Sequence, residues 1–177
     1  MSTEMCRKRL RTTALVLGVG LLFKTAVATS APAALVSVEP MGRFTVGSRL
    51  AELRTLKRSG NCMVQSDYAD CTFTDPNGVA YAVLKTSVTK VTAAEQAVGQ
   101  GVKLPFNLKF GDNFDVAVGK LLLNGTFWIL GRDPESPSAI ILTSRENYAG
   151  KNGWTFGVEI RFVKERLVTV SYISGTV

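Results

Sequence analysis

The stretch from Trp154 to Phe162 constrains the fold more than any other feature of the sequence. Five large apolar residues occupy every second position of it, and the residues between them are polar, charged or glycine. A period of two is typical of a β-strand that buries one face and exposes the other. We therefore expect an antiparallel sheet with one face packed against other elements.

Other apolar segments, separated by turn residues, predict further strands. The expected strands cover 62–65, 69–73, 80–84 and 88–91 in the first half, and 127–130, 139–143, 155–163 and 167–173 in the second. The sequence TDPNG at 74–78 predicts a turn, because proline fixes φ and Asn-Gly accepts positive φ.

A first helix is expected over residues 49–58. Ser48 is a suitable N-cap, and Leu50, Leu53 and Leu56 are spaced three apart, which places them on one helix face.

A second helix is expected over residues 113–123, with Asp112 as its N-cap and Asn124-Gly125 at its end. The residues that would face inward are Phe114, Ala117, Val118 and Leu121.

The two halves of the chain follow the same order. The residues at 108–112 repeat, 64 positions later, the apolar-polar-apolar-Gly-cap pattern of 44–48. We therefore predict an α+β fold of two tandem units, each a helix followed by antiparallel β-strands, with the helices packed on one face of the sheet. The half-units would span about 43–95 and 104–174.

The segment Phe44-Thr45-Val46-Gly47-Ser48 before a helix, followed by antiparallel strands with a Tyr81-centred strand after a glycine turn, resembles a known repeat. It is similar to the unit of the β-lactamase inhibitory protein fold, which small outer-membrane assembly lipoproteins share. The resemblance covers most of residues 42–174 as two units. It implies a protein-binding role in the cell envelope, and no individual binding residue carries over, because no binding motif of the family is matched.

The first residues have the composition of a secretory signal peptide. Basic residues at 7–11 precede an uncharged run at 12–23, which is shorter than the roughly 20 apolar residues that a membrane-spanning helix needs. Small residues then fit the signal-peptidase pattern up to Ala28 and again up to Ala33. We expect cleavage after Ala28, or as late as Ala33. An uncleaved N-terminal anchor is the alternative.

This organisation places a signal peptide at 1–28, an extended segment at 29–42 and a single domain at 43–177. The expected location is the periplasm or the extracellular medium, reached through the cleaved signal peptide.

Removal of the signal peptide takes away most of the positive charge. Five of the 21 basic residues and one of the 14 acidic residues lie in it, which leaves 16 basic and 13 acidic residues and a net charge of +3. A strongly basic protein would favour nucleic acid or an anionic membrane as a partner. We expect neither a nucleic-acid partner nor a membrane span after the signal peptide is removed.

Two cysteines remain in the mature chain, Cys62 and Cys71, because Cys6 lies in the signal peptide. An even pair in an oxidising compartment predicts a disulfide, which would contribute about 2–3 kcal/mol for so short a loop. Two unpaired thiols are the alternative. A zinc site is disfavoured by the lack of histidine, and we expect no metal and no cofactor.

The sequence contains no histidine, the usual general base and a common metal ligand. We therefore expect no catalytic residues and no enzyme activity of the triad or zinc type. Glycoside hydrolysis needs only two carboxylates, so Asp67 with Asp70, or Asp112 with Asp115, stay open as pairs.

Four aromatic residues fall near predicted loops or strand ends, where large amphipathic side chains often anchor a partner. These candidate partner-binding residues are Tyr68, Trp128, Tyr148 and Trp154. Core or edge packing is the alternative for each. The polar loop at 145–153 is a further candidate contact surface.

Together these features predict an exported protein-binding module, an inhibitor or an envelope-assembly factor, whose partner is another envelope or extracellular protein. Two alternatives stay open: a small-ligand carrier, which requires a deep apolar pocket, and a histidine-free, carboxylate-dependent hydrolase of cell-wall glycan. The sequence leaves the oligomeric state and the partner's identity open.

Overall fold

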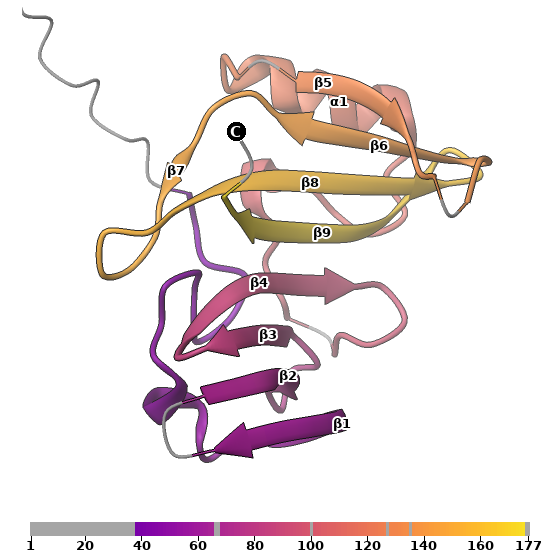
Figure 1. The fold of residues 1–177 in the computed structure, drawn as a ribbon. Helices are drawn as coiled ribbons and strands as arrows, with labels where there is room; N and C mark the ends of the chain where they lie inside the picture. The colour runs from indigo at the N-terminus through magenta and orange to yellow at the C-terminus, as the bar shows by residue number, and fades with distance from the viewer. Residues whose placement is uncertain (1–37, 66–67, 100, 127, 135, 176–177) are drawn as a thin grey trace, which may run out of the picture. The chain divides into compact units, whose positions relative to one another are not determined.

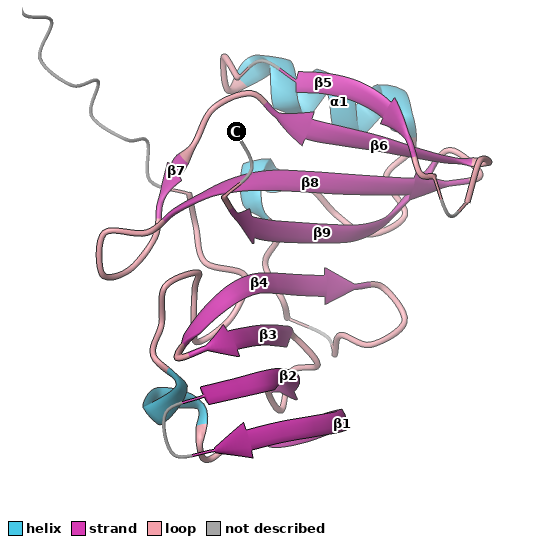
Figure 2. Ribbon diagram, in the orientation of Figure 1, coloured by secondary structure: helices cyan, strands magenta, loops and turns pink. Residues whose placement is uncertain are grey.

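A computed structural model describes the chain from Val38 to Gly175. It describes residues 38–65, 68–99, 101–126, 128–134 and 136–175, with the backbone alone for 60–61, 64–65 and 68–69. These residues form one antiparallel sheet of nine strands and, among those described, one α-helix (Figures 1 and 2).

In chain order, the elements are the 3-10 helix η1 (Leu50–Leu53), β1 (Lys57–Gln65), β2 (Tyr68–Thr74), β3 (Ala80–Lys85), β4 (Ser87–Ala94), the 3-10 turn η2 (Pro105–Asn107), α1 (Phe114–Leu123), β5 (Trp128–Arg132), β6 (Ala139–Ser144), β7 (Tyr148–Ala149), β8 (Thr155–Val163) and β9 (Arg166–Ser174). The strands lie in the order β1-β2-β3-β4-β9-β8-β6-β5, and β7 pairs with β8. Consequently β1 and β5 form the two edges of the sheet.

The predicted tandem helix-plus-sheet fold is wrong, because the described residues of the first half form no α-helix. Only the four residues of η1 are helical where a helix was expected over 49–58. From Lys57 onward the chain pairs with Thr74 and its neighbours on β2. Strand pairing has therefore displaced the last turns that the leucine spacing predicted.

Capping also differs from the expectation at Ser48. Its hydroxyl accepts the Thr45 N–H at 3.2 Å and closes the turn before η1, while Arg49 occupies the N-cap position. Ser48 therefore stabilises a local turn and does not cap a helix.

The second helix is present at the predicted place as α1, with a different cap. Asn113 is the N-cap, and its side-chain oxygen accepts the Val116 N–H at 2.9 Å. Asp112 instead accepts the Lys109 N–H at 2.8 Å and forms an ion pair with Lys120 at 2.7 Å.

The strands expected from the sequence are present, and β7 is an addition. β1 begins at Lys57, earlier than the expected 62, and residue 127 of the expected strand 127–130 lies outside the described residues. The turn at 75–78 is confirmed as well: one Asp75 carboxylate oxygen accepts the N–H groups of Asn77 and Val79, and Gly78 has φ of +83°. The other Asp75 carboxylate oxygen accepts a hydrogen bond from the buried Tyr81 hydroxyl at 2.8 Å. The turn is thus tied to the core of the sheet.

One face of the sheet carries the core. Phe73, Tyr81, Val91 and Tyr172 pair in register across β2, β3, β4 and β9, and each is at most 1 % exposed. Directly opposite residues of an antiparallel pair point to the same face, so these side chains line one continuous surface.

The segment before the first strand and the helix α1 cover this surface. Phe44, before η1, lies edge-on to Tyr81 with ring centroids 5.5 Å apart. Phe114 of α1 lies edge-on to Phe162 of β8 at 5.2 Å. The core is therefore closed by the N-terminal segment at one end and by α1 at the other.

The predicted disulfide between Cys62 and Cys71 is confirmed. It joins β1 to β2, where the two Cα atoms are 4.5 Å apart. In the part of the chain that the structure describes, no helix is both long and apolar enough to cross a membrane.

Candidate binding surface at the β5 edge

The apolar face of the sheet continues to the open edge at β5. Leu142 of β6 pairs with Ile160 on one side and with Leu130 on the other, so the three side chains share a face. Leu142 is 5 % exposed, whereas Leu130 is 65 % exposed. The cover over the core therefore ends between these two leucines.

An open pocket of about 290 Å³ occupies the space where the cover ends. Its lining residues are Phe114, Val118, Leu121 and Leu122 of α1, Thr126 of the connection, Trp128 and Leu130 of β5, and Leu142 of β6. Figure 1 shows α1 running beside β5 and β6. We call this feature the α1–β5 pocket. Among the described residues that line it, Thr126 is the one with a hydroxyl group.

The rim of the α1–β5 pocket is apolar too. Leu122 and Leu130 line it and are nevertheless 66 % and 65 % exposed, and Leu123, next to Leu122 on α1, is 88 % exposed. A single exposed leucine needs no explanation, but a cluster around a pocket is typical of a binding surface.

The two edges of the sheet differ in how open they are to pairing. β1 begins with Lys57 and Arg58, has an irregular register with β2 and is stapled by the disulfide. Charges and bulges are the usual means of blocking an edge strand. β5 pairs regularly with β6 and has one charge, Arg132 at its end, so it is the more open edge.

A cluster of buried and half-buried aromatic rings lies at one end of the pocket. Trp128 donates its indole N–H to the Thr126 hydroxyl at 2.7 Å and lies edge-on to Phe106 at 5.6 Å. Phe106 also contacts Tyr148, which is fully buried against Phe156. Burial, together with the nearby Glu146 carboxylate, raises the pKa of Tyr148 to about 12.

The four predicted partner-binding aromatics occupy different places. Trp128 lines the pocket, and Tyr148 lies behind it with no exposed surface. Trp154 is 37 % exposed in the loop between β7 and β8, beside Gly47 and away from the pocket lining. Tyr68 begins β2, but its side chain lies outside the described part of the chain.

The carboxylate pairs have local roles where they are described. Asp112 is held by Lys120 and the Lys109 N–H, and Asp115 is exposed in the first turn of α1. Asp70 is exposed on β2, while Asp67 lies outside the described residues. Sequence analysis missed Leu122 and Leu130, although the uninterrupted run Leu121-Leu122-Leu123 exceeds what one helix face can bury.

Comparison with known proteins places the chain in no family: no family model matches it, and no curated protein or solved structure does so either. The resemblance to the β-lactamase inhibitory protein fold therefore stays a prediction.

Proposed function

We propose that this chain is an exported protein-binding module that captures an extended segment of a partner protein along β5. The observation that carries the proposal is the open edge of β5 beside an apolar pocket. A strand added there would pair its backbone with β5 and extend the sheet.

The geometry sets the pattern of the captured segment. Residues directly opposite Trp128 and Leu130 would point to the core face, over the α1–β5 pocket, and the residues between them would point away. An apolar side chain opposite Leu130 would cover both exposed leucines of the rim. The expected ligand therefore alternates, with large apolar residues at every second position.

Export is part of the proposal. The signal-peptide composition of the first residues supports it. The Cys62–Cys71 disulfide also favours an oxidising compartment, because disulfides rarely persist in the cytosol.

Selection from a displayed library of random peptides tests the binding mode. The disulfide-bonded protein should enrich peptides with alternating apolar residues, and Leu130→Lys should abolish their binding. Met63→Lys is the matched control, because it places the same charge at an exposed apolar position of the other edge strand. Equal loss with both variants, or enrichment without the alternating pattern, would contradict strand capture at β5. If two copies of the protein associate through β5 and no peptide binds there, capture of a partner protein is contradicted as well.

A small apolar ligand is a second candidate, because the described residues that line the pocket are apolar except for Thr126. A volume of about 290 Å³ fits a small molecule near the lower limit of ordinary ligand sites. Val118→Phe would fill the pocket from α1 without altering the β5 backbone. It should abolish binding of a small apolar dye and leave a peptide held chiefly by main-chain pairing measurably bound.

A further inference from the structure

A second cavity, of about 280 Å³, lies at the opposite half of the sheet, where three distant segments meet. Its lining residues are Arg49, Leu50, Ala51 and Arg54 around η1, Thr86 between β3 and β4, Ser87 at the start of β4, and Asn152 in the loop between β7 and β8.

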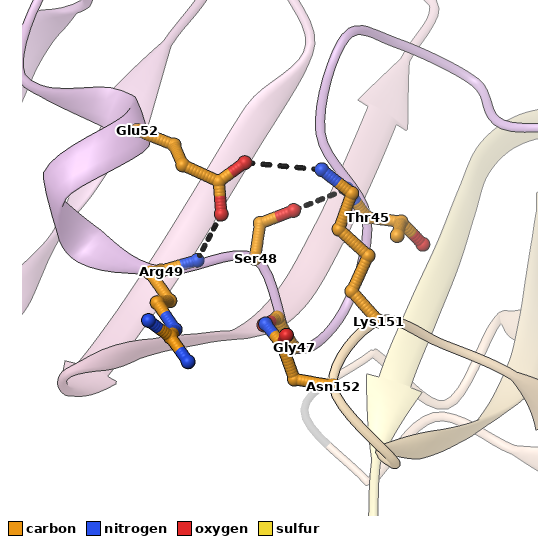
Figure 3. Close-up of polar contacts among 7 residues, drawn as sticks. All are labelled: Thr45, Gly47, Ser48, Arg49, Glu52, Lys151 and Asn152. Atoms are coloured by element: carbon orange, nitrogen blue, oxygen red, sulfur yellow. Dashed lines mark hydrogen bonds and ion pairs between the residues drawn. The ribbon is translucent and has the colours of Figure 1, made fainter.

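Main-chain and side-chain hydrogen bonds hold these three segments together. The Leu50 N–H donates to the Thr86 carbonyl at 2.8 Å, which fixes η1 on the β3–β4 turn. The Asn152 side-chain amide donates to the Gly47 carbonyl at 2.8 Å, which fixes the β7–β8 loop on the turn before η1 (Figure 3). The cavity walls are therefore positioned before any ligand arrives.

Glu52, the acidic residue of η1, is bound by the Arg49 backbone and by Lys151. One Glu52 carboxylate oxygen accepts the Arg49 backbone N–H at 2.8 Å, and the other accepts Lys151 Nζ at 3.0 Å. The Arg49 N–H and then Lys151 lower the pKa of Glu52, so this carboxylate stays ionised in that arrangement. Figure 3 shows the Glu52 carboxylate near Lys151 and the Arg49 guanidinium directed away from it.

In the described part of the chain, the guanidinium groups of the two exposed cavity arginines form no ion pair with a carboxylate, although the charge of Arg49 contributes, as the last of the causes, to the lowered pKa of Glu52. Among the described residues, no carboxylate oxygen lies within 4.0 Å of the guanidinium nitrogens of Arg49 or Arg54. Thr86 and Ser87, which both carry hydroxyl groups, line the same cavity, and Leu50, 7 % exposed, adds an apolar wall.

We propose that this cavity binds a small organic anion through a carboxylate or phosphate group held by Arg49 and Arg54. A guanidinium presents a planar fork of N–H donors that matches both groups. The hydroxyls of Thr86 and Ser87 would supply further donors, and the wall at Leu50 would contact the ligand's carbon skeleton. The volume restricts the ligand to a small molecule.

Titration calorimetry of the disulfide-bonded protein with inorganic phosphate and with succinate, at constant ionic strength, tests the site. We expect saturable binding that Arg49→Gln weakens by roughly ten- to a hundredfold, the effect of losing a charge-assisted hydrogen bond. Arg54→Gln, which leaves the hydrogen-bonded frame around Gly47 untouched, should weaken it as well. Arg58→Gln is the control, because it removes the same charge from an exposed position outside the cavity.

A further arm distinguishes a free anion from a lipid headgroup. If vesicles of phosphatidylcholine with phosphatidic acid bind the protein in an Arg49-dependent way while soluble phosphate competes, the phosphate chemistry is supported and a headgroup is its source. The proposal is overturned if neither soluble anion binds saturably, or if Arg58→Gln weakens binding as much as Arg49→Gln. Peptide capture at β5 is unaffected by either result, because none of the cavity residues lies in β5 or α1.

Discussion

At the residue scale, the buried tyrosines carry much of the polar chemistry of the core. Tyr81 donates to the buried Asp75 carboxylate, and Tyr172 donates to the Glu39 carbonyl. A hydrogen bond to a charged acceptor is worth more than one to a neutral acceptor. The two tyrosines therefore offer a matched comparison.

Tyr81→Phe should lower the free energy of unfolding by about 1.5–3 kcal/mol, because the Asp75 carboxylate loses a donor inside the protein. Tyr172→Phe should cost about 0.5–1.5 kcal/mol, because its acceptor belongs to the exposed residue Glu39. Urea unfolding followed by tryptophan fluorescence measures both losses. Equal losses would show that the charge of Asp75 adds nothing.

Alkaline pH should destabilise the protein through the same residues. Burial raises the pKa values of Tyr81, Tyr148 and Tyr172 above the usual value, to about 12 for Tyr148. The contribution of the protonated tyrosines to folding stability is complete below a pH of about 10, the pKa of an unfolded tyrosine. It is lost as the pH rises through the pKa of the folded state. The free energy of unfolding should fall by up to about 1.4 kcal/mol per pH unit for each tyrosine.

Urea midpoints between pH 8 and pH 11 measure this slope. Tyr148→Phe should reduce the fall of the unfolding free energy with pH by the contribution of one tyrosine. An unchanged slope would mean that Tyr148 titrates equally in the folded and unfolded protein.

At the element scale, the strands were predictable and the first helix was not. Period-two alternation from Trp154 to Phe162 depends on local burial, and β8 has the expected buried residues from Phe156 onward. The leucines at 50 and 53 are buried as a helix would bury them, yet η1 is one short turn. A spacing of three over two turns cannot distinguish an α-helix from a 3-10 turn that leads into a strand.

The candidate site was less predictable than the strands. Trp128 was identified from its sequence position, but the α1–β5 pocket depends on where the sheet ends. No local pattern shows that β5 is an edge strand. It pairs with β6 alone, because β4 joins the second half of the sheet at β9, a strand distant from it in sequence, and not at β5.

Two glycines test how the elements are held. Gly47 has φ of +84°, and a Cβ there would lie 2.2 Å from the Lys151 carbonyl oxygen, whereas Gly119 lies in α1 with open space around its Cβ position. Gly47→Ala should cost more than about 1 kcal/mol of unfolding free energy. Gly119→Ala should add about 0.5–1 kcal/mol through helix propensity. Thermal or urea unfolding measures both changes in free energy. A Gly47→Ala variant as stable as the wild type would contradict the close packing of the β7–β8 loop on the turn at Gly47.

At the scale of the whole molecule, one apolar face runs through the sheet and loses its cover at β5. Leu142 and its partner Leu130 lie on either side of that limit. Leu142→Ala should cost about 2–5 kcal/mol of unfolding free energy, as buried leucines do. Leu130→Ala should cost much less, because most of its side chain is already in water. Comparable losses, measured by urea unfolding, would place Leu130 inside the core.

Hydrogen exchange of the β5 amides, followed by NMR with and without a selected peptide, tests the central claim most directly. In the free protein, the β5 amides that are not bonded to β6 should exchange quickly, because the edge is unpaired. A saturating peptide should slow their exchange and leave the β1 amides unchanged. Amides that are already protected in the free protein, or that exchange at the same rate with peptide bound, would contradict capture of a partner strand at β5.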